Sequence, residues 1–201
     1  MQHCADHDAD RRRIIEVTYC CLSEPHPGPI LMSEILRRAR VSTRAFYRHF
    51  DSKDDLFLAL LQQETDALVT AVDRIAEEAV GSPADQLAAW IGEMFDMCAD
   101  PRRRMQLAVI DSDEVRAAKG YREARERGQA DRERSLTEIL RRGRADGSLP
   151  LADPDFDAAA ISIVVARVLA AQEFEHPQDL RQAQRQTLDF ALRSVGAVVA
   201  T

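Results

Sequence analysis

Apolar residues recur at intervals of three and four along most of the chain, the spacing of one face of an α-helix. The first such stripe stops at residues 23–29 (SEPHPGP), where three prolines cannot continue a helix. Its members are Ile14, Ile15, Thr18, Cys21 and Leu22. The pattern therefore predicts a first helix that ends near residue 22.

The next segment predicts two short helices separated by a tight turn. An apolar face on Leu31, Ile35 and Leu36 marks the first of them. Ser42 stands where an N-cap residue is needed for a second helix over residues 43–50 (TRAFYRHF). Three apolar residues in and before this second helix point inward together: Val41, Phe46 and Phe50. The pattern is that of a helix, a turn and another helix.

Longer helices follow. Start signals, apolar stripes and breaks at Gly or Pro predict six of them. Their approximate ranges are 53–80, 84–99, 102–115, 120–145, 154–174 and 178–200. Ala, Arg, Leu and Glu are abundant, which favours helices over sheets, so we predict an all-α fold.

Charge is distributed unevenly. The chain carries a net charge of −7, yet residues 1–52 hold eight arginines and seven acidic residues, a net charge of +1. Within residues 37–53, six cations accompany one acidic residue, a net charge of +5. A basic patch on an acidic protein predicts a local contact with nucleic acid.

Other features exclude several classes of protein. The N-terminus has no apolar segment after its charges, and the longest apolar run is shorter than the roughly 20 residues that a membrane span needs. The four cysteines have neither the density of a disulfide scaffold nor a C-x-x-C spacing. We expect a cytoplasmic protein that contacts no membrane and holds no metal or cofactor.

The second short helix carries a polar outer face, on Thr43, Arg44, Tyr47, Arg48 and His49. A helix, a turn and a helix with such a face form the layout of a helix-turn-helix, whose second helix enters the major groove. The alternative is a solvated helix face with core aromatics behind it.

Residues 35–61, ILRRARVSTRAFYRHFDSKDDLFLALL, resemble the signature of the TetR family of bacterial one-component regulators. The resemblance covers about Arg11 to Leu61. It implies a helix-turn-helix DNA-binding domain over residues 1–52 and a helical effector-binding and dimerisation domain over residues 53–201. It also implies residues that contact double-stranded DNA, with Lys53 on a phosphate: Ser33, Ser42, Thr43, Arg44, Ala45, Tyr47, Arg48, His49 and Lys53.

Three positions depart from the family pattern. Leu31 stands where the family has a capping Thr, Leu36 where it has Ala, and Arg40 where the turn has Gly. A non-glycine residue with positive φ costs about 1 kcal/mol, which a packed pair of helices can absorb. Arg44 replaces a small residue of the family, so we expect it to add a contact with a base or a phosphate.

The second domain offers fewer signals. Trp90, Phe95 and Tyr121 are candidates to line an apolar effector site, and a solid core is the alternative. The last two predicted helices carry apolar faces that exceed what one partner helix would cover, which predicts a homodimer. These faces comprise Ile161, Val164, Val165, Val168, Leu169, Leu180, Leu188, Leu192 and Val195. The alternative is that both faces pack inside the monomer.

The sequence thus predicts a ligand-responsive transcriptional regulator. We expect a repressor that binds a palindromic operator as a dimer and is released by a small molecule. No catalytic motif supports the alternative of a small helical enzyme. The alternative of an adaptor that binds only protein leaves the basic patch unexplained.

Overall fold

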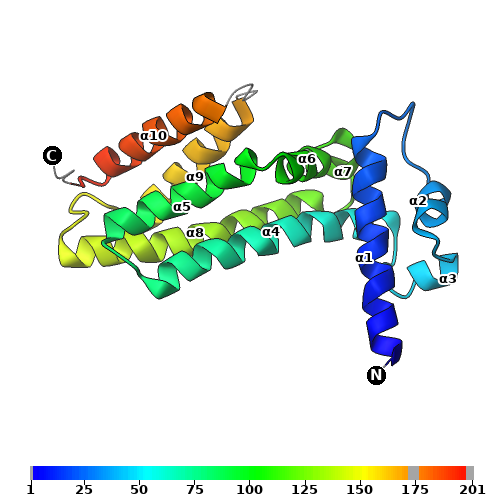
Figure 1. The fold of residues 1–201 in the computed structure, drawn as a ribbon. Coiled ribbons are helices and arrows are strands. Elements are labelled where there is room, and N and C mark those ends of the chain that lie inside the picture. The colour runs from blue at the N-terminus through cyan, green and yellow to red at the C-terminus, as the bar shows by residue number, and fades with distance from the viewer. Residues whose placement is uncertain (1, 172–176, 198–201) are drawn as a thin grey trace. The chain divides into compact units, whose positions relative to one another are not determined.

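The computed structural model describes residues 2–171 and 177–197, and all regular structure in that part of the chain is helical (Figure 1). The all-α prediction is confirmed. The helices are α1 (Gln2–Ser23), α2 (Met32–Ala39), α3 (Thr43–Phe46), α4 (Lys53–Glu78), α5 (Pro83–Ala99), α6 (Pro101–Ile110), α7 (Asp113–Arg116), α8 (Tyr121–Asp146), α9 (Pro154–Ala171) and α10 (Pro177–Ser194). None of them is both long enough and apolar enough to cross a bilayer.

The chain divides into two compact units. The first, called here the N-terminal unit, comprises Met1–Thr65 and Met105–Glu126, and the second comprises Asp66–Arg104 and Arg127–Thr201. Helices α4, α6 and α8 each begin in one unit and end in the other. The predicted functional boundary between residues 52 and 53 remains a prediction, because these units reflect packing alone.

One hydrophobic core holds the N-terminal unit together. It joins apolar side chains of α1, α2, α3 and the start of α4 to Val109, Ile110 and Val115. The buried hydroxyl of Tyr19 on α1 donates hydrogen bonds to the Leu60 carbonyl oxygen and to Glu64 on α4, both at 3.1 Å. Burial raises the pKa of this phenol, so it remains a hydrogen-bond donor at neutral pH.

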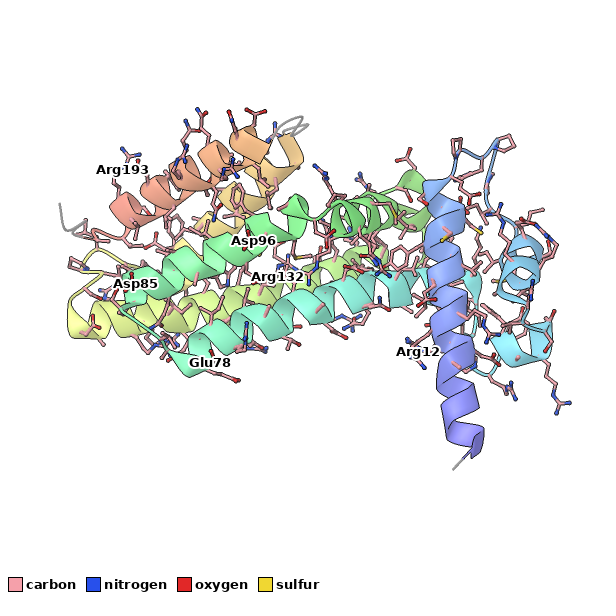
Figure 2. The ribbon with its side chains drawn as sticks, in the orientation of Figure 1. Arg12, Glu78, Asp85, Asp96, Arg132 and Arg193 are labelled. Carbon is pink, nitrogen blue, oxygen red and sulfur yellow. The ribbon has the colours of Figure 1, made fainter. Side chains whose placement is uncertain are left out.

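The second unit is built around α5, which contacts α9 and α10 (Figure 1). Ser82 caps α5 in a reciprocal arrangement with Asp85, labelled in Figure 2. The Arg142 guanidinium on α8 donates to the Ala76 carbonyl oxygen of α4 at 2.8 Å and to Gln86 of α5 at 2.7 Å. These bonds hold the end of α8 against the end of α4 and the start of α5, 66 and 56 positions away in the sequence.

The structure corrects several expected details. The second short helix ends at Phe46 rather than residue 50, because residues 47–49 form tight turns. The predicted helix over residues 102–115 is two helices, α6 and α7, with a break at Asp111 and Ser112. Leu31 does not share the buried face of α2 and is 68% exposed. The predicted ends at Phe174 and Ala200 lie outside the described residues.

Candidate nucleic-acid interface

The turn between α2 and α3 depends on one left-handed residue. Arg40 has φ 53° and ψ 42°, as its place in a glycine position predicts. This conformation lets the Arg40 N–H reach the Arg37 carbonyl oxygen at 3.3 Å, and lets the Val41 N–H reach that of Leu36 at 3.1 Å. The turn therefore forms with an arginine in place of glycine, and the Arg40 side chain is exposed.

Helix α3 begins as the sequence predicts. The Ser42 hydroxyl accepts a hydrogen bond from the Ala45 N–H at 3.1 Å, the geometry of an N-cap. Val41, Phe46 and Phe50 are all buried, so the expected inward face is confirmed. The rings of Phe46 and Phe50 lie 5.4 Å apart, centroid to centroid.

The outer face of α3 differs in part from the expected one. Thr43, Arg44, Tyr47 and Arg48 are exposed, and Tyr47 retains 59% of its surface. Ala45 is buried among core residues, so it does not face the solvent that a DNA duplex would displace. The small side chain of alanine at this position lets α3 pack close to the neighbouring helices.

His49 also differs from expectation. Its side chain is half-buried, and both ring nitrogens are shielded from solvent. The ring stands 6.2 Å from that of Phe50, centroid to centroid. In this conformation the imidazole nitrogens are not presented to a duplex.

Two of the six cations of residues 37–53 belong to a neutral cluster. Glu34 accepts hydrogen bonds from Arg37 at 2.7 Å and from Arg38 at 2.7 Å, and Arg38 also reaches Glu24 at 2.7 Å. Hydrogen bonds from Arg37 and Arg38 lower the pKa of Glu34 to about 2, so this carboxylate is ionised at neutral pH. Two carboxylates and two guanidinium groups therefore cancel in charge.

Two further cations have carboxylate partners. The exposed Arg48 lies 3.6 Å from Asp10 of α1, which is half-buried. Lys53 lies 2.6 Å from Glu114 of α7, and the two side chains retain 28% and 16% of their surface. Among the described residues, Arg40 and Arg44 are the cations of this segment that form no ion pair. The net positive field that the sequence predicts thus comes from the turn and from α3.

Ser33 lies exposed in the first turn of α2, where free backbone N–H groups favour an anion. Leu31 occupies the N-cap position and provides no side-chain cap, in line with its departure from the family pattern. The Ser33 hydroxyl and the first N–H groups of α2 are therefore available to an outside acceptor.

The candidate effector residues fall in different units. Trp90 and Phe95 belong to α5 in the second unit and are completely or almost completely buried. Tyr121 belongs to the N-terminal unit, where its hydroxyl donates to Asp111 at 3.0 Å. Burial raises the pKa of Tyr121 to about 12. We therefore keep Trp90 and Phe95 as effector candidates and assign Tyr121 to the N-terminal core.

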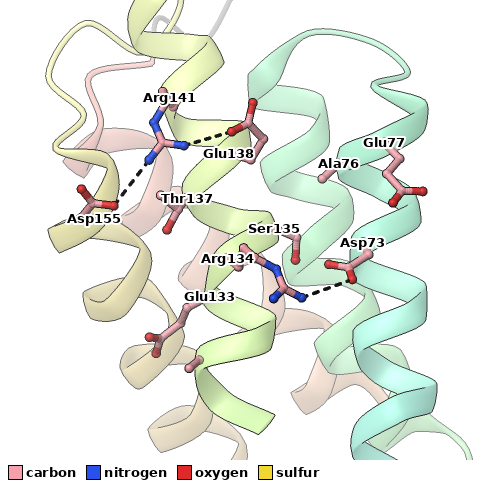
Figure 3. Close-up of a pocket in the computed structure, with 11 residues that line it drawn as sticks. Asp73, Ala76, Glu77, Glu133, Arg134, Ser135, Thr137, Glu138, Arg141 and Asp155 are labelled. Carbon is pink, nitrogen blue, oxygen red and sulfur yellow. Dashed lines mark hydrogen bonds and ion pairs between the residues drawn. The ribbon is translucent and has the colours of Figure 1, made fainter. Parts of the chain in front are cut away.

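The second unit also has an open groove of about 730 Å³, which Figure 3 shows. It is polar: five carboxylates and two arginines line it, and neither Trp90 nor Phe95 does. Arg141 pairs with Glu138 at 3.0 Å and with Asp155 at 3.6 Å, while Arg134 reaches Asp73 at 3.9 Å. Ion pairs between its own walls account for much of this charge.

Comparison with known proteins agrees with this geometry. Residues 30–60, which span α2, α3 and the start of α4, match the model of a family described as bacterial regulatory proteins, tetR family. The helix-turn-helix segment of this chain is therefore of the TetR type. This segment is thus the DNA-binding module of a transcriptional regulator.

Two curated TetR-type regulators are similar in sequence. The transcriptional activator FasR of Mycolicibacterium smegmatis is 42% identical over 84 residues, which cover 42% of this chain and only 37% of that protein. The transcriptional repressor Rv1474c of Mycobacterium tuberculosis is 26% identical over 176 residues, which cover 79% of this chain and 93% of that protein. The relatives of this chain therefore include both an activator and a repressor.

Solved structures share the fold. A complex of SmeT with triclosan aligns with a TM-score of 0.77 and 24% identity over 92% of this chain and 91% of that one. FadR from Bacillus subtilis, in complex with stearoyl-CoA, aligns with a TM-score of 0.74 and 18% identity over 91% of this chain and 98% of that one. The helical fold of these structures therefore extends over most of this chain.

Proposed function

We propose that the chain is a ligand-responsive repressor that binds a palindromic operator as a homodimer and is released by a small molecule. The observation that carries the proposal is the exposed surface of the turn and α3, where Arg40 and Arg44 have no carboxylate partner among the described residues and Thr43 and Tyr47 stand beside them. Side chains of this kind read base edges in the major groove. Ser33 and Ser42 flank them as phosphate contacts.

Selection from randomised duplex DNA tests the proposal. A dimer that reads one half-site with each α3 enriches a palindrome whose half-sites are centred about 34–36 Å apart, one turn of DNA. Enrichment of one asymmetric site would contradict the symmetric reading, and enrichment of no duplex would favour the enzyme or the adaptor.

The proposed dimer forms through α9 and α10. The structure buries Ile161, Val165, Leu180 and Val195 of the predicted apolar face inside the monomer, so these residues are unsuited to an interface. Each helix nevertheless exposes a large apolar residue: Ile163 on α9 is 57% exposed and Phe190 on α10 is 43% exposed. Residues of this kind on the outer side of the last helices support self-association.

Sedimentation velocity tests the dimer. Ile163→Asp and Phe190→Asp introduce a charge on the proposed interface and should give folded monomers at micromolar concentration, because a charge without a partner is costly to bury. Val80→Asp is the matched control: Val80 is 74% exposed in the loop after α4, and its variant should stay dimeric. A monomeric wild type would contradict the proposal.

The proposed effector site lies around Trp90 and Phe95. The indole Nε1 of Trp90 is buried, and no acceptor for it lies within hydrogen-bonding distance among the described residues. A buried donor without an acceptor costs about 1–3 kcal/mol, so an apolar molecule with one well-placed oxygen would gain by binding there. Structures of the same fold hold triclosan and stearoyl-CoA, which combine these features.

Release follows from differential binding. An effector that prefers the conformation unable to bind DNA by about 1.4 kcal/mol lowers operator affinity tenfold. We propose that the change passes along α4, a single helix from Lys53 to Glu78 that begins in one unit and ends in the other. A tilt of α4 alters the distance between the two recognition helices of a dimer.

Tryptophan fluorescence can report on binding at Trp90, since the chain has only one tryptophan. A panel of phenols, ketones and fatty acids is screened for a change in tryptophan emission and for release of the operator. Trp90→Phe keeps an aromatic ring and removes the N–H, so it should weaken an effector of this kind about tenfold and leave DNA binding intact. Effectors whose affinity is unchanged in Trp90→Phe and Phe95→Ala would place the site elsewhere.

A further inference from the structure

Ile30, just before α2, is held by a side-chain network that the sequence gives no sign of. The carboxylate of Glu114 accepts the Ile30 N–H with both oxygens, at 3.0 and 3.2 Å. Lys53 donates to the Ile30 carbonyl oxygen at 2.5 Å and to the same Glu114 carboxylate at 2.6 Å. All three residues belong to the N-terminal unit. The network, called here the Ile30 clasp, thus binds both backbone polar groups of one residue.

The Ile30 clasp lies where the chain enters α2, and it fixes this entry. Ile30 directly precedes Leu31, the N-cap position of α2, which lacks a side-chain cap. The segment before it, residues 25–29, is PHPGP, and within the described part of the chain it makes no backbone–backbone hydrogen bond that would fix the entry of the chain into α2. Ile30 is itself only 7% exposed, so its backbone groups need protein partners. Lys53 and Glu114 provide them.

The clasp also fixes Lys53. Its ammonium group lies between the Ile30 carbonyl oxygen and the Glu114 carboxylate, and 5.1 Å from the centroid of the Phe57 ring. An ammonium group has three donors, and two of them are used inside the protein. A DNA phosphate would have to compete with a carboxylate at 2.6 Å for the same charge. Lys53 is therefore placed to hold the protein together at this point.

We propose that Glu114 is a positioning residue for DNA recognition, and that Lys53 acts with it as a clasp on Ile30 rather than as a phosphate ligand. The clasp joins three elements: the start of α2, which bears Ser33, the start of α4, and α7. It sets where α2, and with it the turn and α3, stands against α4. This inference rests on the proposed function, because it concerns how the operator is read.

Two variants and one control test the clasp. Glu114→Gln keeps one acceptor oxygen for the Ile30 N–H and removes the charge that holds Lys53. Lys53→Met keeps the aliphatic stem over Phe57 and removes the ammonium group. Asp113→Asn is the matched control, since it removes the same charge from a neighbouring exposed position of α7. Affinities are measured for the selected operator and for a random duplex over a series of salt concentrations, at a temperature where circular dichroism shows every variant folded.

A clasp predicts that Glu114→Gln and Lys53→Met each weaken operator binding about tenfold and that the double variant is no weaker than either one. The loss falls on the operator more than on random DNA, and the slope of log K against log salt is unchanged, because no phosphate contact is removed. Asp113→Asn binds the operator like the wild type.

Other results would overturn the clasp. If Lys53→Met weakens operator and random DNA equally and lowers the slope by about 0.9, Lys53 is a phosphate ligand. If Glu114→Gln binds the operator like the wild type, Glu114 positions nothing. A wild type that selects no duplex contradicts the proposed function instead. In that case urea unfolding of the same variants still tests the clasp: non-additive losses of stability support it, and additive losses contradict it.

Discussion

Two groups of cations lie within one short segment of this protein, and they differ in what they touch. Arg37, Arg38, Arg48 and Lys53 are each bound to a carboxylate. Arg40 and Arg44, in the turn and in α3, have no such partner among the described residues. The sequence count of +5 therefore overstates the charge that this surface presents to a polyanion. What DNA meets is the charge that the fold leaves unpaired.

The difference has an electrostatic reason. A phosphate that approaches Arg38 must displace Glu24 and Glu34 or accept their repulsion. A phosphate or guanine that approaches Arg44 meets a cation that no carboxylate of the described residues neutralises. Exposed ion pairs are individually weak, about 0–1 kcal/mol, so the paired cations are not locked. The neutral cluster still adds no long-range attraction.

The largest effect, on the free energy of unfolding, is expected in the hydrophobic core of the N-terminal unit. Phe46 is completely buried, so Phe46→Ala should lower the free energy of unfolding by about 3–5 kcal/mol, measured by urea denaturation. Its neighbour Tyr47, which is 59% exposed, is the control: Tyr47→Ala should change stability by less than about 0.5 kcal/mol and weaken operator binding. A stable Phe46→Ala variant would contradict the assigned core.

A smaller effect is expected at the strained turn. Arg40→Gly relieves a positive φ that costs about 1 kcal/mol, partly offset by the greater freedom of glycine in the unfolded chain, so stability should rise by about 0.5 kcal/mol. Arg40→Ala removes the same charge but keeps the strain, and should bring no such gain. The two variants should lose the same affinity for DNA, since each removes one unpaired cation. Equal stability of the two would show that the turn is unstrained.

The smallest effect is expected on stability at low pH. The pKa of Glu34 is lowered to about 2, from 4.5, by hydrogen bonds from Arg37 and Arg38. A folded-state pKa below the unfolded one means that the stabilisation is complete above pH 4.5 and disappears as the pH falls towards 2. The difference in urea midpoint between the wild type and Glu34→Gln should therefore shrink over this range. A constant difference would mean that the neutral cluster does not form in solution.

The sequence was sufficient for most of the fold, because its signals are local. The prolines after α1, the cap at Ser42 and the left-handed residue at Arg40 all act within a few positions of the chain, and the structure confirms them. The break between α6 and α7 was missed, since Asp111 and Ser112 carry no Gly or Pro signal.

The ion pairs of the interface could not be predicted in the same way. Glu114 lies 61 positions from Lys53 and 84 from Ile30, and Glu24 lies 14 from Arg38. No pattern along the chain marks such partners, because tertiary folding alone brings them together. Ala45 was misplaced for a related reason: periodicity gives the direction of a side chain on a helix but not the closeness of the neighbouring helix.

Operator affinity over a series of salt concentrations, for the wild type, Arg44→Ala and Arg38→Ala, most directly tests the distinction between unpaired and paired cations. Arg44→Ala should weaken binding to the selected operator by about 1–3 kcal/mol, with a smaller loss on random DNA if Arg44 reads a base. Arg38→Ala should bind within about twofold of the wild type, with the same slope of log K against log salt. If Arg38→Ala instead loses as much affinity as Arg44→Ala and its slope falls by about 0.9, the ion pairs do not decide which cations face the DNA.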